Sequence, residues 1–127
     1  GRNVKLVDSL IDYLLQKNGQ KLFLEIKSAL LHEGDLALYP DAPSLRGQKH
    51  IKRLLDLAQK GSRSALLFIS SWPWVRAFAP NEGIDPEIAL LLRQAHREGV
   101  IVRAINITLD SRNWAVLLLD QDLPVFF

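Results

Sequence analysis

The 127-residue chain has 48% hydrophobic and 24% charged residues, which is ordinary for one globular domain with its own core. It contains no cysteine, so disulfide frameworks, thiolate zinc sites and thiol nucleophiles are excluded. The formal net charge is only +2, and no apolar run approaches the roughly 20 residues of a membrane span. We therefore expect a soluble, cytoplasmic domain with no membrane contact, whose overall charge is weak evidence for a nucleic-acid partner.

The first strong signal along the chain is Asn18-Gly19 between two apolar runs, which is typical of a tight β-hairpin. When these two residues form the loop, counting back along antiparallel strands sets Asp12 opposite Glu25 and Leu10 opposite Lys27. Asp12, Glu25 and Lys27 then share one face of the hairpin. The sequence thus predicts that two acids and a lysine meet on neighbouring strands.

The same register gathers an unbroken apolar surface on the other face, which we expect to pack on the core. Its members are Ile11, Tyr13, Leu15, Leu22, Leu24 and Ile26. On the charged face, two acids directly opposite each other repel, so their charge needs compensation. Mg²⁺ or Mn²⁺ is the natural candidate, because these ions prefer oxygen ligands and a nearby lysine can steady a phosphate. We therefore expect a metal site at Asp12 and Glu25 with Lys27 beside it.

Residues 4–16 also allow a second interpretation. Their apolar residues recur at helical spacing, so this segment could be an amphipathic helix on which Asp8 and Asp12 are merely solvated. A Glu-x-Lys triplet such as Glu25-Ile26-Lys27 is also common at strand edges. Spacing alone leaves the metal site and this plainer alternative open.

The rest of the chain alternates between predicted strands and helices. After an extended piece at 36–39 and a proline-containing loop, Ser44 is a good N-cap for a helix that ends near Lys60. Asp85 caps a second helix that closes at Glu98. The apolar runs at 64–70 and 100–108 are predicted strands, the first of them central and covered on both faces. This order predicts an α/β fold, a mixed sheet with an early β-hairpin and flanking helices. An acidic pair on an early hairpin, followed by a helix and a buried strand, is also the order of restriction-endonuclease-like nucleases, which is an analogy at this point.

Basic residues recur at steps of three and four in the first of these helices, with no acid among them. They are Arg46, Lys49, His50 and Arg53, and we interpret them as a ridge that contacts nucleic-acid phosphates. For His50, a phosphate contact, a proton shuttle and a plain surface position remain open. The buried stripe of this helix is expected to comprise Leu45, Ile51, Leu54, Leu55 and Ala58.

Trp72-Pro73-Trp74 interrupts the chain directly after the first buried strand. The two indole rings could stack on unpaired bases, pack on the core or lie in an interface, and the sequence leaves these alternatives open. His32 and His96 receive no role.

Several segments together resemble the sugar fermentation stimulation protein family. They lie at 9–15, 23–28, 37–44, 46–50, 78–81, 84–86 and 123–125. The most distinctive is Ala-Leu-Tyr-Pro-Asp-Ala at 37–42, followed by Arg46-Gly47 and Lys49-His50. The chain departs from the family where Leu10 replaces a common arginine and where residues 72–75 replace polar ones.

This resemblance implies a DNA-associated protein of two parts, an N-terminal OB-like domain and a C-terminal domain of the PD-(D/E)xK nuclease class. Residues 1–127 resemble only the second part, as a single nuclease-like domain. The resemblance implies that Asp12 and Glu25 bind Mg²⁺ or Mn²⁺, that Ile26 lends its backbone carbonyl, and that Lys27 is the catalytic lysine. The expected partner is DNA, and no small-molecule partner is expected.

Three functions are compatible with these expectations. The first is a DNA-binding protein that hydrolyses phosphodiesters with a divalent metal. The second is a non-catalytic DNA-binding regulator linked to sugar metabolism genes. The third is an interaction module whose hairpin acids are only surface charges.

Overall fold

The computed structural model describes residues 2–6 and 9–127, and the side chains from Ile11 onward. In this part of the chain six strands form a large sheet: β1 (Arg2–Leu6), β2 (Ser9–Lys17), β3 (Gln20–Ser28), β6 (Arg63–Ser70), β8 (Ile101–Asp110) and β9 (Ala115–Asp120). A small sheet contains β4 (Leu31–Glu33), β5 (Leu36–Tyr39) and β7 (Ala77–Pro80). The helices are α1 (Leu45–Gln59) and α2 (Pro86–Arg97).

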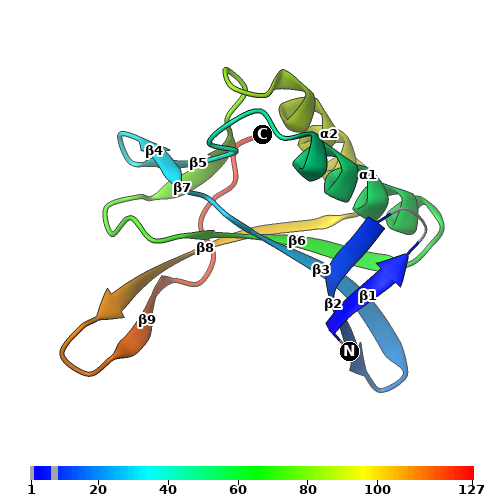
Figure 1. Ribbon diagram of the computed structural model, residues 1–127, viewed down its shortest axis with the longest axis horizontal. Helices are drawn as coiled ribbons and strands as arrows, with labels where there is room; N and C mark the ends of the chain where they lie inside the picture. The colour runs from blue at the N-terminus through cyan, green and yellow to red at the C-terminus, as the bar shows by residue number, and fades with distance from the viewer. Residues whose placement is uncertain (1, 7–8) are drawn as a thin grey trace.

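The large sheet is mixed, with the strand order β1-β2-β3-β6-β8-β9. β3, β6 and β8 run parallel, whereas β1, β2 and β9 pair with their neighbours antiparallel. Both helices lie over the same face of this sheet, and the small sheet sits beside them (Figure 1). The predicted α/β fold with a mixed sheet and an early hairpin is confirmed.

The hairpin of β2 and β3 has the predicted register. Tyr13 pairs with Leu24, and the pairing continues in step to the turn. Asn18 and Gly19 have φ values of 51° and 78°, as a two-residue turn with two left-handed positions requires. The alternative of a helix over 4–16 is wrong, because residues 9–16 belong to β2. The side chain of Leu10, predicted opposite Lys27, lies outside the described side chains.

The apolar face of this hairpin is not the core face, apart from Ile11, which is fully buried. Tyr13, Leu22, Leu24 and Ile26 are only partly buried, and Leu15 is 46% exposed. Parallel pairing sets Glu25 beside Leu66 and Lys27 beside Phe68, and both of these apolar partners belong to the core beneath α1. The prediction was wrong because the pairing with β6, a distant segment, decides which face of the hairpin the helices cover.

The same arrangement corrects the expectation for β6. Ser64, Leu66 and Phe68 are buried, whereas on the opposite face only Ala65 is buried and Leu67 and Ile69 are partly buried. Coverage on both faces was predicted from a continuous apolar run. Since both helices lie over one face, β6 is fully covered on that face alone (Figure 1).

The two helices begin and end where their caps predict. Oγ of Ser44 accepts the N–H of Gly47 at 2.8 Å, and Lys60 is the C-cap of α1, before Gly61 with φ of +85°. Asp85 caps α2 by accepting the N–H of Ile88, and it also accepts the N–H of Ser44 at 2.9 Å. This one carboxylate therefore ties the starts of both helices together.

The buried stripe of α1 differs from the prediction at two positions. Leu45, directly after the N-cap, is 78% exposed, and Ala58 is only partly buried. The residues that α1 buries are Gly47, His50, Ile51, Leu54, Leu55 and Leu57. Neither helix in the described residues is long and apolar enough to cross a bilayer.

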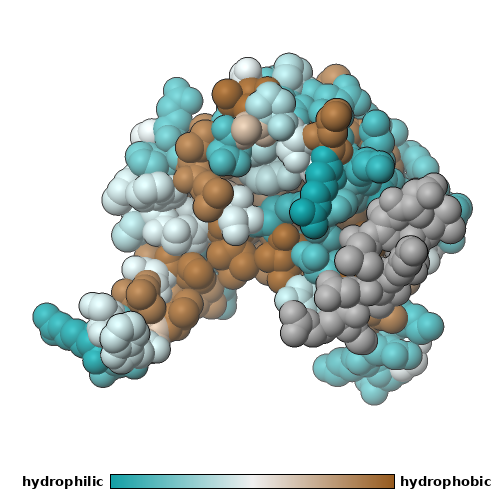
Figure 2. Space-filling model, in the orientation of Figure 1, coloured by the Kyte–Doolittle hydropathy of each residue, from teal (hydrophilic) through white to brown (hydrophobic). Residues whose placement is uncertain are grey.

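The β8–β9 hairpin projects from the body of the molecule and carries exposed apolar side chains (Figures 1 and 2). They include Leu109, Trp114, Val116, Leu117, Leu118 and Leu119. β9 forms one edge of the large sheet, so this surface is remote in strand order from β2 and β3.

Candidate metal centre

Two acids meet where β2 and β3 run side by side. The backbone N–H of Asp12 donates to Oε2 of Glu25 over 3.3 Å, and the N–H of Ile26 donates to Oδ2 of Asp12 over 3.1 Å. Each carboxylate is therefore held by the backbone of the opposite strand. This reciprocal bonding orients both acids toward the same space, as the hairpin register predicts.

Glu25 is the most buried member of this group, with 1% of its surface exposed. Its Oε1 lies 3.2 Å from Nζ of Lys27. Burial raises the pKa of Glu25; Lys27 opposes that rise and the neighbouring Asp12 adds to it. Lys27 therefore does not offset the combined effect of burial and of Asp12 on the pKa of Glu25.

His50 of α1 completes the group, and its side chain is buried at 7% exposure. Its Nδ1 lies 3.0 Å from Oε1 of Glu25 and 2.6 Å from Nζ of Lys27. Burial, followed by the charges of Lys27 and Arg46, lowers the pKa of His50 to about 4. The ring is then neutral at pH 7, and Nδ1 accepts a hydrogen bond from the Lys27 ammonium, which leaves the ring proton on Nε2.

Because the His50 ring is neutral, it does not compensate the negative charge of Glu25 and Asp12. Nδ1 of His50 and Oε1 of Glu25 are both acceptors, yet they lie only 3.0 Å apart. A cation that draws the Glu25 carboxylate toward Asp12 would relieve this contact and favour the ionised acid.

The donor set also fits a hard divalent cation. Among the described residues no three His, Cys, Asp or Glu side chains gather as a metal cluster, and the acidic side chains that the structure brings together here are the carboxylates of Asp12 and Glu25. Mg²⁺ typically binds through one or two carboxylates and retains several waters. Two carboxylates are therefore a donor set that fits a hard divalent cation better than a metal that demands a full protein cage.

The structure corrects the interpretation of His50 as part of an exposed ridge. Arg46 and Lys49 are exposed on α1, but His50 points into the site, and Arg53 is partly buried and paired with Asp56 at 3.1 Å. The sequence does contain a signal for this outcome. His50 follows Gly47 by three residues and precedes Leu54 by four, which is the spacing of the inward-facing stripe.

Gly47 is a second residue whose importance the sequence reasoning missed. A Cβ at this position would collide with the hydroxyl of Tyr39 and would lie 2.9 Å from Oγ of Ser44. Only a glycine lets α1 approach the end of β5 this closely. The close approach positions His50, one turn further along α1, over Glu25.

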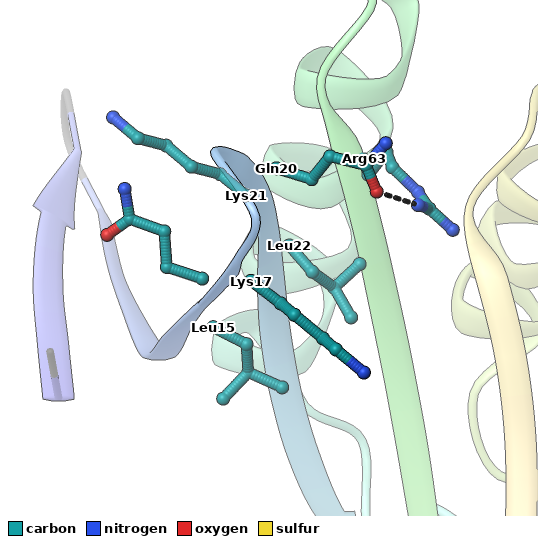
Figure 3. Close-up of a pocket in the computed structure, with 7 residues that line it drawn as sticks. Leu15, Lys17, Gln20, Lys21, Leu22 and Arg63 are labelled. Atoms are coloured by element: carbon teal, nitrogen blue, oxygen red, sulfur yellow. Dashed lines mark hydrogen bonds between the residues drawn. The ribbon is translucent and has the colours of Figure 1, made fainter.

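A cavity of about 330 Å³ lies elsewhere, at the tip of the β2–β3 hairpin. Figure 3 shows that its basic side chains diverge: Lys17 and Lys21 point in different directions, and Arg63 bonds to Gln20 at 3.3 Å. Its lining contains neither acid of the candidate metal centre. The cavity therefore does not extend that site.

Known proteins resemble this chain over most of its length. A sugar fermentation stimulation protein homolog from Pyrococcus furiosus is 44% identical over 109 residues, which is 86% of this chain and 47% of that protein. Homologs from Syntrophotalea carbinolica and Archaeoglobus fulgidus are 41% and 40% identical, over 94% and 98% of this chain and 51% and 52% of their own lengths. The chain thus spans about half the length of these curated relatives.

A solved structure, described as that of Pyrococcus furiosus SfsA in complex with Ca²⁺, matches this fold with a TM-score of 0.95. The two are 38% identical, and the match covers 100% of this chain and 54% of that one. The model of the family described as the sugar fermentation stimulation protein RE domain matches residues 1–113. With a family model over most of its length and relatives of about 40% identity, the chain belongs to the sugar fermentation stimulation protein (SfsA) family.

Proposed function

We propose that this domain binds DNA and hydrolyses its phosphodiester bonds with the help of a divalent metal ion held between β2 and β3. The observation that carries the proposal is the Glu25 carboxylate, 1% exposed, held against a second acid and 3.2 Å from Lys27. Burying a charged group is costly unless a partner compensates it. A protein has little reason to maintain this arrangement for stability alone, so a functional role is favoured.

The metal preference follows from the donors. The relative from Pyrococcus furiosus has been described in complex with Ca²⁺, a hard cation that takes oxygen ligands as Mg²⁺ and Mn²⁺ do. We assign the ligand role to Asp12, Glu25 and the carbonyl of Ile26. A bound divalent cation would lower the pKa of a nearby water and neutralise charge that develops on the phosphate.

The remaining residues of the site act on position and charge. Lys27 offers its ammonium where negative charge grows during phosphoryl transfer, and it orients the attacking water. Nδ1 of His50, at 2.6 Å from Nζ, holds that ammonium in place. The N–H of Ile26 fixes the Asp12 carboxylate through its bond to Oδ2. We therefore assign His50 and the Ile26 amide positioning roles.

DNA is supported as the substrate by charges on α1. Arg46 and Lys49 are exposed on the helix that carries His50, and both contribute to lowering the pKa of His50. Their field therefore reaches His50, which contacts both Glu25 and Lys27. A phosphate backbone held by these two residues would run past the candidate metal centre, with little base readout.

Cleavage by the purified protein tests the catalytic part. Labelled DNA is incubated with Mg²⁺, Mn²⁺ or EDTA, and the Lys27→Ala variant is compared with Lys60→Ala, which removes an exposed lysine at the end of α1. We expect metal-dependent cleavage that falls by about 100-fold or more in Lys27→Ala, is retained in Lys60→Ala, and is accompanied by nearly unchanged DNA affinity.

Two outcomes would contradict the catalytic proposal. Equal cleavage by wild type and Lys27→Ala would identify a contaminating nuclease. DNA binding without cleavage under any metal would favour the alternative, a non-catalytic DNA-binding regulator.

DNA affinity measured at several salt concentrations tests the role of α1. Reversing both charges with Arg46→Glu and Lys49→Glu should weaken binding and reduce the salt slope by about 2. Arg97→Glu, at the exposed end of α2, serves as the control. An unchanged slope in the double variant would make these residues a solvated helix face.

A further inference from the structure

We propose that His32, Trp72 and Trp74 form a platform on which unpaired nucleobases stack. The inference rests on the proposed function for its ligand class, DNA, and adds the kind of DNA: a strand with a single-stranded segment beside the metal centre. We call these three residues the aromatic platform.

The three rings of the aromatic platform are all in mutual contact. The ring centroid of His32 lies 4.7 Å from that of Trp72 and 5.0 Å from that of Trp74, and the centroids of the two indoles are 5.3 Å apart. Nε1 of Trp72 donates to the carbonyl of Leu30 at 3.0 Å, and Nε1 of Trp74 donates to Nδ1 of His32 at 3.4 Å. The N–H groups of both indoles thus have partners within the protein; Nδ1 of His32, which also lies 3.2 Å from the carbonyl of Gly34, accepts from Trp74 in the tautomer that carries its proton on Nε2. With Trp74 51% exposed, apolar ring surface remains for a ligand.

The loop that carries the two tryptophans is anchored to the core. Nδ2 of the buried Asn106 donates to the carbonyl of Trp72 at 2.8 Å, and the N–H of Val75, itself 5% exposed, donates to the same carbonyl at 3.2 Å. The rings are therefore held in place before any ligand arrives. Pre-organised aromatic surface binds at a low entropy cost, which distinguishes this loop from an ordinary connection.

The aromatic platform lies at the carboxyl end of β3, which carries Glu25 and Lys27, and at that of its parallel neighbour β6. Leu30 follows Lys27 by three residues, and an extended chain covers at most about 10 Å in that interval. Trp72 follows Phe68, the β6 partner of Lys27, by four residues. An unpaired base a few nucleotides from a phosphate at Lys27 would therefore reach the rings.

Unpaired bases are the occupant that this chemistry favours. Bases within a duplex already stack on their neighbours, whereas an unpaired base offers a free face to aromatic rings. The charges near the aromatic platform in the sequence are mixed: Glu33 and Asp35 are negative, and Arg76 is positive. Its contribution should therefore be stacking, with the phosphate attraction coming from Arg46 and Lys49 on α1.

The test measures binding in EDTA, where metal-dependent cleavage is suppressed, with fluorescently labelled oligothymidine and a blunt duplex of equal length. Trp74→Ala should weaken oligothymidine binding about tenfold or more, and it should leave duplex affinity and the salt slope unchanged. Trp74→Phe should retain most of the affinity because it keeps an aromatic face. Trp114→Ala is the matched control, since Trp114 is 85% exposed at the far turn of the β8–β9 hairpin.

The outcomes separate this inference from the proposed function. The aromatic platform would be overturned if Trp74→Ala bound oligothymidine as tightly as the wild type. It would also be overturned if Trp114→Ala lost as much oligothymidine affinity, or if Trp74→Ala lost as much affinity for the duplex. Unchanged binding would leave a protein partner as the alternative for this surface. Cleavage and its dependence on Lys27 would be unaffected by that result. Conversely, selective loss in Trp74→Ala supports the aromatic platform even if no metal permits cleavage.

Discussion

Replacing Asp12 by Asn should stabilise the metal-free protein while removing its response to divalent metal. The amide oxygen of Asn can still accept the N–H of Ile26, which now bonds to Oδ2 of Asp12 at 3.1 Å. The substitution removes the negative charge that helps to raise the pKa of Glu25. In the folded state, the buried Glu25 carboxylate then ionises at a lower cost.

The magnitude follows from the separation of the two acids. Carboxylates on directly opposed residues lie roughly 5 Å apart, and at an effective dielectric constant of about 20 they repel by about 3 kcal/mol. Asp12 is partly exposed, and solvent screening reduces this to about 1 kcal/mol. For a chain of this size, such a gain raises the melting temperature by about 3 to 5 °C. A metal at 100 times its dissociation constant would stabilise the wild type by about 2.7 kcal/mol.

Thermal unfolding followed by circular dichroism, in EDTA and in Mn²⁺, checks this reasoning. Asp12→Asn should melt above the wild type in EDTA and below it in Mn²⁺, so that the order reverses. Asp35→Asn, an exposed acid in the β4–β5 turn, should match the wild type in both conditions. A variant that is less stable in EDTA, or that keeps the full Mn²⁺ shift, would refute the idea that the two acids repel and share a cation.

Two further predictions concern α1. Burial lowers the pKa of His50 from 6.5 to about 4, so as pH falls the unfolded chain binds a proton at this histidine before the folded protein does, and the free energy of unfolding declines between these pH values by at most about 3 kcal/mol. His50→Asn should lose this part of the pH dependence when stability is measured by denaturant titration at several pH values. Identical pH profiles for the variant and the wild type would contradict the buried neutral ring. Gly47→Ala should destabilise the protein by about 1 kcal/mol, because the collision of the new methyl group with the Tyr39 hydroxyl outweighs the gain in helix propensity. Gly83→Ala is the control: its methyl group meets no atom within 4 Å, so this variant should have the melting temperature of the wild type.

The hairpin register could be predicted because its causes are local. Asn18-Gly19 prescribes a two-residue turn, and period-two alternation then sets Asp12 close to Glu25 without reference to the rest of the chain. The helix boundaries at Ser44 and Asp85 were readable for the same reason, since a cap bonds to backbone groups three residues away.

The composition of the site could be predicted only in part. Asp12, Glu25 and Lys27 come from one hairpin, so the sequence brought them together. His50 comes from a helix that begins 17 residues after β3 ends, and its contact with Glu25 depends on how closely α1 approaches the sheet. That approach rests on the missing side chain of Gly47, which spacing does not reveal.

The sequence by itself determined the β2–β3 hairpin, the strands β5, β6 and β8, the helix caps, the family and the pairing of two acids with a lysine, because turn chemistry, capping and side-chain alternation act over a few residues. The tertiary structure alone decided that the charged face of the hairpin is the buried one, since the parallel pairing of β3 with β6 turns Glu25 under α1. It also gathered His32 and Trp74 on one surface, although 42 residues separate them. Contacts of this kind depend on the packing of distant segments, which no local pattern encodes.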